Sequence, residues 1–241
     1  MHSDDLHVRE TAPRQAVILA AGRGRRLRPH TDHTPKPLLE VDGQPILYHT
    51  LCALQNAGVE ELFVVIGHLG RQIADYVGDG SRWKMRASFH WQPQRLGTAH
   101  ALCQVRSVLQ EPTFILAADY ALAPQSMKEM KSAYQQSNAS LALSLKELQP
   151  GEIASRSSVE FDPGGAITRI VEKPEPGAAP SLIGASLIYI VPPEIDSYLK
   201  TITLSERQEY EIVDVINRMI AGGHRVVGIM QSRPREWRPQ S

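Results

Sequence analysis

The sequence predicts an α/β fold in which helices cover both faces of a mostly parallel sheet. Up to Gln149, short apolar runs typical of buried strands alternate with segments that have helical periodicity. Two of these apolar runs end in residues suited to ligand binding, since Gly22 follows Val17–Ala20 and Asp119 follows Thr113–Ala118. Ligands of such sheets bind beyond the carboxyl ends of the strands, so both positions are candidates for a functional site.

The elements of the first half follow in order from this alternation. Val17–Ala20 is an apolar strand, and Ile46–Ala57 is a helix because its leucines recur on one helical face before Gly58 caps it. The remaining strands of this half are Leu62–Ile66, Ala87–Trp91, Thr113–Ala118 and Leu141–Leu145. The remaining helices are Arg71–Tyr76, Thr98–Val108 and Pro124–Gln135.

From Pro150 onward the pattern changes to shorter β segments, which we expect to extend the same sheet. They are Ser158–Phe161, Ile167–Val171 and Ser186–Val191, followed by helices Pro193–Lys200 and Glu209–Ala221 and a strand Arg225–Ile229. The acidic residues Glu209, Glu211 and Asp214 favour the amino end of the late helix, where the helix dipole stabilises negative charge. We expect a disordered leader over residues 1–15, which are polar and acidic, and a single domain over 16–241.

Composition excludes several classes of protein. Lys plus Arg and Asp plus Glu number 26 each, so no global positive charge favours nucleic-acid binding. No apolar run approaches the length of a membrane span. Cys52 and Cys103 fall in apolar helical patterns and are expected to be buried thiols, which fits a cytoplasmic location. Nothing in the sequence defines the oligomeric state, and a homo-oligomer stays among the expectations.

The segment Ala16–Leu39 carries the strongest chemical signal. A buried strand leads into Gly22 and Gly24, which lie among a cluster of arginines and Lys36. Glycines let the backbone approach a ligand closely, so that consecutive N–H groups can surround an anion. The basic side chains can then neutralise phosphate oxygens through charge-assisted hydrogen bonds. This segment therefore predicts a triphosphate-binding loop.

Two common phosphate loops do not fit this segment. The dinucleotide fingerprint needs a third glycine where this chain has Leu27, and a Walker-type loop needs Gly-Lys-Ser/Thr, which is absent. The pattern L-A-A-G-x-G-x-R-L-x-P-x-T-x-x-x-P-K-P instead resembles the signature of the sugar-1-phosphate nucleotidylyltransferases, or NDP-sugar pyrophosphorylases. The resemblance implies a Rossmann-like nucleotide-diphospho-sugar transferase fold, with residues 16–149 mainly binding nucleotide and 150–241 mainly binding sugar phosphate.

Three later motifs agree with this resemblance. Gln92 precedes Leu-Gly-Thr-Ala at Leu96–Ala99, and its amide can both donate to and accept from a pyrimidine edge. Asp119 follows a fully apolar strand, where a carboxylate can hold Mg²⁺ against triphosphate oxygens. Glu172-Lys173-Pro174 can bind sugar hydroxyls through Glu172 and the acceptor phosphate through Lys173.

A fourth family motif is incomplete. Relatives carry a second metal-binding Asp in W-x-D-x-G, but if Trp237 is that tryptophan, Pro239 stands in place of the Asp. An altered carboxyl end, a substitute ligand such as Glu236, and a loss of activity all stay open as explanations. Tyr189 fits a sugar-side motif only loosely, and packing in the core is the alternative.

The resemblance implies nucleotidylyl transfer from a nucleoside triphosphate to a sugar 1-phosphate, with Mg²⁺ as cofactor and neither nucleic acid nor membrane as partner. It assigns catalytic roles to Arg26, Lys36 and Lys173, and metal binding to Asp119. The implied nucleotide contacts are Leu19, Ala20, Ala21, Gly22, Gly24, Gln92, Gly97 and Thr98, and the implied sugar-phosphate contacts are Glu172, Lys173 and Tyr189. Gln92 favours UTP or dTTP. CTP or GTP, and a binding protein without catalytic activity, are the alternatives.

Overall fold

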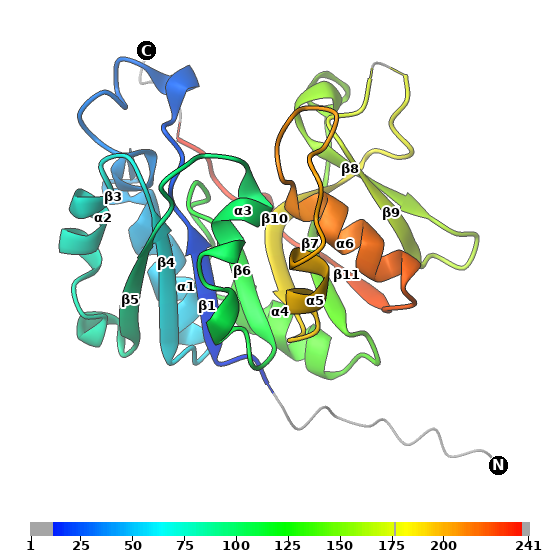
Figure 1. Cartoon of the computed structure of the whole chain (residues 1–241), viewed down its shortest axis with the longest axis horizontal. Helices are drawn as coiled ribbons and strands as arrows, with labels where there is room; N and C mark the ends of the chain where they lie inside the picture. Colours follow the sequence, from blue (N-terminus) through cyan, green and yellow to red (C-terminus); the bar gives the residue numbers. More distant parts are fainter. Residues whose placement is uncertain (1–11, 176, 238–241) are drawn as a thin grey trace.

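The computed structural model describes residues 12–175 and 177–237 and confirms the predicted α/β fold. A nine-stranded sheet runs through the molecule, and its main path has the order β11-β7-β10-β6-β1-β4-β5 (Figure 1). Its strands are β1 Gln15–Leu19, β4 Glu61–Ile66, β5 Arg86–Trp91, β6 Thr113–Ala117, β7 Leu141–Glu147, β8 Ser157–Phe161, β9 Ile167–Glu172, β10 Ile183–Val191 and β11 Val226–Met230. A separate small hairpin pairs β2 Glu40–Val41 with β3 Gln44–Pro45.

Pairing in this sheet is parallel on both sides of one antiparallel strand. Strands β6, β1, β4 and β5 are parallel to one another, and β11 is parallel to β7. Strand β10 lies between these two groups and is antiparallel to both β6 and β7. Strands β8 and β9 form an antiparallel pair joined to β10, so the second half extends the same sheet, as predicted.

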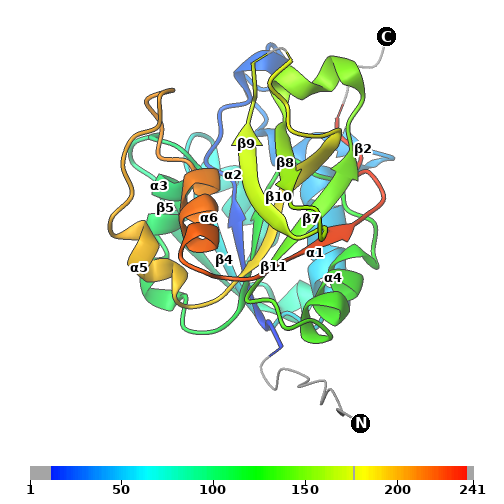
Figure 2. The same cartoon turned by 90° about the vertical axis from the view of Figure 1, so that its right-hand side faces the viewer.

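Helices cover both faces of the sheet (Figure 2). One apolar cluster holds α1 Ile46–Asn56, α2 Gly70–Val77 and α4 Ser126–Gln135 against one face. A second cluster holds α3 Thr98–Cys103, α5 Ile195–Leu199 and α6 Ile212–Ala221 against the other. Successive strand residues point to opposite faces, which is why Ile18 packs in the first cluster and Val17 in the second.

Several predicted boundaries differ from the structure. The helix predicted over Thr98–Val108 ends at Cys103, and a 3₁₀ turn follows at Arg106–Val108. The late helix begins at Ile212 rather than Glu209 because Tyr210 makes backbone hydrogen bonds to the segment before α3. Cys52 and Cys103 are free thiols but only half-buried, since both lie at the margins of the helix faces that pack on the sheet.

Ordered structure begins inside the predicted leader. Residues 1–11 lie outside the described part of the chain. Gln15 already belongs to β1, and the Arg14 carbonyl accepts hydrogen bonds from the backbone N–H groups of Glu60 and Glu61. Pairing with β4 therefore orders the chain before Val17, where the predicted strand begins. Among the described residues, no helix is both long enough and apolar enough to cross a membrane.

Phe114 offers a test of the central packing. Its side chain is fully buried on β6, the strand between β1 and β10. Truncation in Phe114→Ala leaves a cavity that this sheet cannot collapse to fill, so we expect the free energy of unfolding to fall by about 3–5 kcal/mol. Urea denaturation measures the change, and Phe161→Ala, at a position 36% exposed, is the control. A loss below about 1 kcal/mol for Phe114→Ala would contradict the assigned packing.

Candidate functional site

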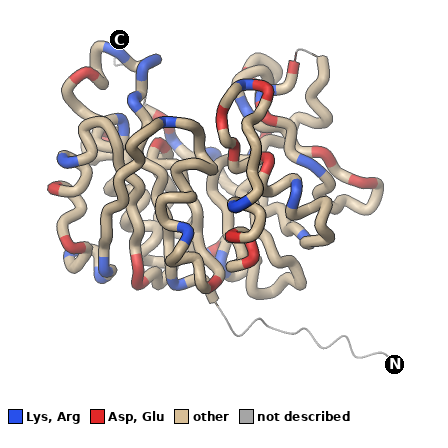
Figure 3. Tube along the Cα trace, in the orientation of Figure 1, with Lys and Arg blue, Asp and Glu red and all other residues tan. Residues whose placement is uncertain are grey.

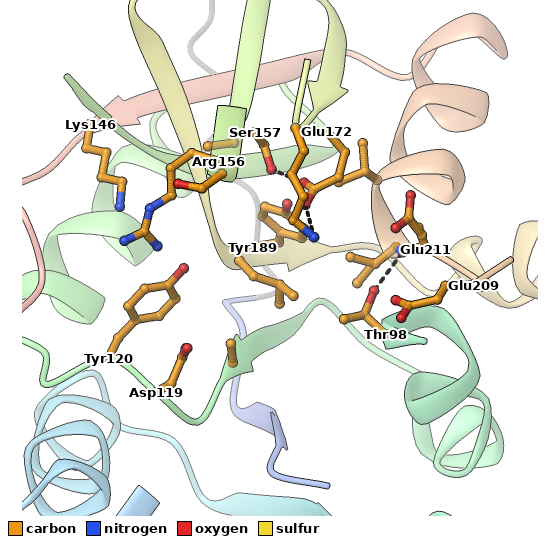
Figure 4. A pocket seen from close by; sticks show the side chains of 17 residues that line it. Thr98, Asp119, Tyr120, Lys146, Arg156, Ser157, Glu172, Tyr189, Glu209 and Glu211 are labelled. Atoms are coloured by element: carbon orange, nitrogen blue, oxygen red, sulfur yellow. Dashed lines mark hydrogen bonds and ion pairs between the residues drawn. The ribbon is translucent and has the colours of Figure 1, made fainter. Parts of the chain in front are cut away.

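Three adjoining cavities lie at the carboxyl ends of the central strands. The first, which we call the glycine-loop cavity, has a volume of about 250 Å³ and is lined by Leu19, Ala20, Gly22, Gly24, Lys36, Pro37, Ala117, Ala118 and Asp119. The Gln92 cavity measures about 220 Å³ and is lined by residues from the glycine loop, from Gln92 to Ala101, and by Leu187 and Glu209. The Glu172 cavity also measures about 220 Å³ (Figure 4). Because Ala117 lines all three, they form one continuous depression.

The glycine loop is fixed by a contact between its two ends. Gly24 has a φ of +60°, and the Thr31 hydroxyl donates a hydrogen bond to its carbonyl at 2.9 Å. A Cβ at Gly24 would lie 2.9 Å from Thr31 Cγ2, whereas a Cβ at Gly22 would meet no atom within 4 Å. The loop is therefore closed against Thr31 on one side, and Gly22 leaves its backbone open to the cavity.

Lys36 and Asp119 meet across the glycine-loop cavity. Parallel pairing places Leu19 of β1 level with Ala117 of β6, so the segments after these two strands leave the sheet together. The Lys36 ammonium donates to Asp119 Oδ2 at 2.8 Å. The other oxygen, Asp119 Oδ1, is buried and has no hydrogen-bond partner among the described residues. One side of this carboxylate is thus neutralised, and the other still lacks a partner.

The four arginines of the basic loop, Arg23, Arg25, Arg26 and Arg28, are all exposed, and the positions of Lys and Arg along the chain are coloured blue in Figure 3. Arg28 forms an ion pair with Asp32 at 3.1 Å. Arg26 is exposed on the 3₁₀ turn Arg25–Leu27 and lines none of the three cavities. Of the predicted catalytic residues, Lys36 therefore lies in a cavity and Arg26 lies outside.

Gln92 is buried at the end of β5, where its side chain lines the second cavity. Its amide nitrogen donates to the Gly97 carbonyl at 3.2 Å and to His100 Nδ1 at 2.9 Å. These contacts fix the orientation of the amide and occupy its donor side. The acceptor oxygen is the part of Gln92 left for a ligand.

Gly97 joins this cavity to the neighbouring Glu172 cavity through the loop before α6. It has a φ of +117°, and a Cβ there would lie 2.3 Å from the Tyr210 carbonyl oxygen. The N–H of Ala99 donates to that carbonyl at 2.9 Å, and the N–H of Ile212 donates to the Thr98 hydroxyl at 3.0 Å. Close backbone packing that only glycine permits therefore fixes α3 against α6.

Glu172 and Lys173 lie at the carboxyl end of β9. The Ser157 hydroxyl donates to Glu172 Oε2, and the Lys173 ammonium lies 3.4 Å from Glu172 Oε1. Lys173 has a φ of +47°, and its backbone N–H donates to the Arg156 carbonyl at 2.9 Å. The two predicted acceptor-side residues are thus brought together with Thr98, Asp119 and Tyr189 in one cavity.

Tyr189 lies on β10 and is 1% exposed. It packs in the second apolar cluster and also lines the Glu172 cavity, where burial raises the pKa of its hydroxyl. Both expectations for this residue, a place in the core and a place at the site, are therefore compatible with its position.

Two charged side chains lie near Glu172, and the sequence patterns did not identify one of them, Arg207. Arg207 donates to the Glu172 carbonyl at 3.1 Å and forms an ion pair with Glu211. Glu211 is the N-cap residue of α6, at the amino end where an acid was expected, although its side chain makes no capping hydrogen bond. Burial raises the pKa of Glu211, and the hydrogen bond from Arg207 opposes that shift.

On the opposite side of the Glu172 cavity lie Lys146, Arg156 and Tyr120. Lys146 is only 3% exposed, and its ammonium lies 5.9 Å from the centre of the Tyr120 ring. In the sequence its one signal is a lysine directly after the apolar run of β7. Arg156 gives no local signal, since an arginine before a short strand is an ordinary surface residue.

The last described segment of the chain returns to the site. Arg235 forms an antiparallel bridge with Ala121, and the Trp237 ring lies 4.8 Å from the ring of His30 in the basic loop. Arg156 lies 2.7 Å from one oxygen of Glu236 and donates to the other at 2.8 Å. Pro239, which stands where relatives carry an Asp, lies outside the described residues.

Asp119 is the described residue best placed to bind a metal ion. No cluster of three or more His, Cys, Asp or Glu side chains suited to a metal occurs among the described residues. The unpartnered Oδ1 of Asp119 fits one position in the coordination shell of a hard cation such as Mg²⁺. Such a cation takes its remaining ligands from phosphate oxygens and water. Burial raises the pKa of the Glu236 carboxyl group. The hydrogen bond from Arg156 and its positive charge act in the opposite direction, and the pKa of Glu236 is lowered overall.

Comparison with known proteins identifies a family. A sequence model described as nucleotidyl transferase matches residues 15–238. UTP–glucose-1-phosphate uridylyltransferase from Haloferax volcanii is 32% identical over 89% of this chain and 87% of its own length. Glucose-1-phosphate thymidylyltransferase from Streptomyces griseus is 32% identical over 88% of this chain, which spans 59% of that protein.

A solved structure shares the fold. The crystal structure of a UDP-glucose pyrophosphorylase complexed with UDP-glucose has a TM-score of 0.79 and covers 90% of each chain at 21% identity.

Replacement of Gly97 tests the packing between α3 and the loop before α6. In Gly97→Ala the new Cβ would meet the Tyr210 backbone, and the positive φ would itself be strained. We expect the free energy of unfolding in urea to fall by about 2 kcal/mol or more. Gly151→Ala, where a Cβ would meet no atom within 4 Å, is the matched control. Equal stability of the two variants would show that this close contact is absent.

Proposed function

This chain belongs to the nucleotidyl transferase family, and on that premise we propose that it transfers a nucleotidyl group from UTP or dTTP to a sugar 1-phosphate. The observation that carries the proposal is the contact of Lys36 with Asp119 beside the open backbone of Gly22. It places a cation, a carboxylate and free backbone donors in one cavity, as a bound triphosphate requires. The names of the relatives favour an enzyme over a protein that only binds nucleotide.

The reaction is a direct in-line displacement. An oxygen of the acceptor 1-phosphate forms a bond to the α-phosphorus of the nucleotide, and the bond from that phosphorus to the bridging oxygen of the β-phosphate breaks. Pyrophosphate leaves with the electron pair of that bond, and no covalent intermediate with the protein is needed. Catalysis then consists of positioning the two phosphates and stabilising the charge that develops on the leaving group.

Residues on two sides of the site bind the two phosphates that react. Lys36 binds the nucleotide phosphates from the glycine-loop cavity, and Lys173 binds the acceptor phosphate from the Glu172 cavity. Glu172, whose carboxylate is oriented by Ser157, accepts hydrogen bonds from sugar hydroxyls. Arg26 reaches the outer phosphates from its exposed position on the loop. Mg²⁺ held by Asp119 supplies charge neutralisation when bound.

Nucleotide choice rests on Gln92. Its amide nitrogen is already used by Gly97 and His100, so its oxygen is oriented to accept the ring N–H of uracil or thymine. Cytosine lacks a hydrogen on that ring nitrogen. An acceptor oxygen at this position therefore supports UTP or dTTP over CTP. Gly97 and Thr98 line the same cavity and contact the edge of the base.

Pyrophosphate release tests the proposal directly. The purified protein is incubated with Mg²⁺, each nucleoside triphosphate in turn and a panel of sugar 1-phosphates. We expect release with UTP or dTTP and a loss of release when EDTA removes the metal. Absence of release with every pair, under conditions in which nucleotide binding is measurable by calorimetry, would refute the proposed transfer.

Lys36→Ala tests the catalytic assignment. Removal of one preorganised charge contact typically costs about 3–4 kcal/mol of transition-state stabilisation, so we expect turnover to fall at least about a hundredfold. Lys128→Ala, at an exposed position on α4, is the control and should turn over at the wild-type rate. Turnover of Lys36→Ala within a few-fold of wild type would remove Lys36 from the mechanism.

A further inference from the structure

Lys146 is a buried cation without an acidic partner. It is 3% exposed on β7, yet no described residue accepts a hydrogen bond from its ammonium or forms an ion pair with it. The ammonium lies over the face of the Tyr120 ring, and the side chain borders the Glu172 cavity (Figure 4). Buried charges in proteins are normally paired, so this ammonium needs a partner from outside the described chain.

Apart from Arg95, which lines the Gln92 cavity, the other cations of the site already have partners. Lys36 pairs with Asp119, Lys173 with Glu172, and Arg207 with Glu211. Arg156, which lies beside Lys146, pairs with both oxygens of Glu236. The cluster of Lys146, Arg156 and Glu236 therefore keeps one net positive charge. Glu209, the remaining acid of the cavity, lies at its opposite end (Figure 4).

We propose that Lys146 and Arg156 bind a carboxylate carried by the acceptor sugar, so that this protein selects acidic sugar 1-phosphates over neutral ones. The inference rests on the proposed function, because it takes the Glu172 cavity as the acceptor site. A carboxylate supplies the single negative charge that the cluster lacks. It also accepts hydrogen bonds from both the ammonium and the guanidinium.

The phosphates of the two substrates are the other anions available to this cluster. Each of them already has a cation in the proposed mechanism, since Lys36 serves the nucleotide and Lys173 the acceptor phosphate. Lys146 lines the same cavity as Lys173 but from a different strand, and Figure 4 shows it on the opposite side of that cavity from Glu172, the partner of Lys173. A further anionic group on the acceptor sugar would balance the positive charge that remains on the cluster of Lys146, Arg156 and Glu236.

The electrostatics of the unliganded site agree with this role. Burial and the positive charge of Arg156 both lower the pKa of Lys146. A carboxylate placed between these two cations would offset both effects. Such a site gains more from an anionic ligand than an exposed surface lysine does, because charges in a partly enclosed cavity attract one another more strongly than charges in water.

Matched acceptor pairs test the proposal by binding. Isothermal titration calorimetry compares glucuronic acid 1-phosphate with glucose 1-phosphate, and N-acetylmuramate 1-phosphate with N-acetylglucosamine 1-phosphate. The members of the first pair differ by oxidation of C6 to a carboxylate, and those of the second by a lactyl ether on O3 that ends in a carboxylate. Because hydrogen bonds between charged groups are stronger than those between neutral groups, we expect the acid of at least one pair to bind at least about tenfold more tightly.

Lys146→Met assigns the preference to this side chain. Methionine keeps an unbranched chain of similar length without burying a charge, so the fold is expected to persist, and thermal denaturation checks it. We expect the ratio of the two dissociation constants within the preferred pair to fall to within about threefold of unity. Lys128→Met, exposed on α4, is the control and should keep the wild-type ratio.

The outcomes separate this inference from the proposed function. Preferential binding of an acid that Lys146→Met abolishes supports the inference, even if no pyrophosphate is released. Turnover of neutral and acidic acceptors with equal affinities leaves the function intact and overturns the inference. Equal weakening of both members of a pair in Lys146→Met would mean that the cluster holds a phosphate, and this also overturns it. Absence of binding by all four acceptors overturns it as well.

Discussion

The parallel pairing of β1 with β6 is the constraint on which the site depends. It places Leu19 level with Ala117, so the glycine loop and Asp119 leave the sheet at the same height. Lys36 can then reach Asp119 from a segment 83 residues earlier in the chain. If the register slipped by one residue, the side chains of these strands would exchange faces and both apolar clusters would be lost. The core that stabilises the sheet therefore also fixes the distance between the loop and the carboxylate.

A second constraint couples the Gln92 cavity to the Glu172 cavity. Gly97 closes against the Tyr210 backbone, and the segment around Tyr210 also carries Glu209 and Glu211 at the edge of the Glu172 cavity. The loop that borders the Gln92 cavity thus packs directly on the loop that borders the acceptor side. Hydrogen bonds from Ala99 and Ile212 fix this junction on both flanks. A displacement of α6 would move both sides together, because no flexible linker separates them.

Charge is distributed unequally along the depression. Lys173 and Arg207 are matched by Glu172 and Glu211, and Glu209 adds a negative charge to that part of the site. On the opposite side, Lys146 and Arg156 are two cations, and Glu236 from the last described segment is the acid that pairs directly with Arg156. Charged groups in a cavity with apolar walls interact more strongly than they do in water. Selectivity among related sugars is therefore expected to depend on the side of Lys146 and Arg156 more than on the paired residues around Glu172.

The sequence by itself determined the fold class and much of the site, because those signals are local. The glycine loop, Asp119 after an apolar strand, and the Glu172-Lys173-Pro174 motif are each recognisable within a few residues. Only the tertiary structure decided which of these side chains meet, since contacts such as Lys36 with Asp119 depend on strand order and register. It also identified Lys146 and Arg156, whose proximity requires β7, β10 and β8 to pair across the sheet. No local pattern reports that a lysine is buried without a partner, because burial and pairing are properties of the folded chain.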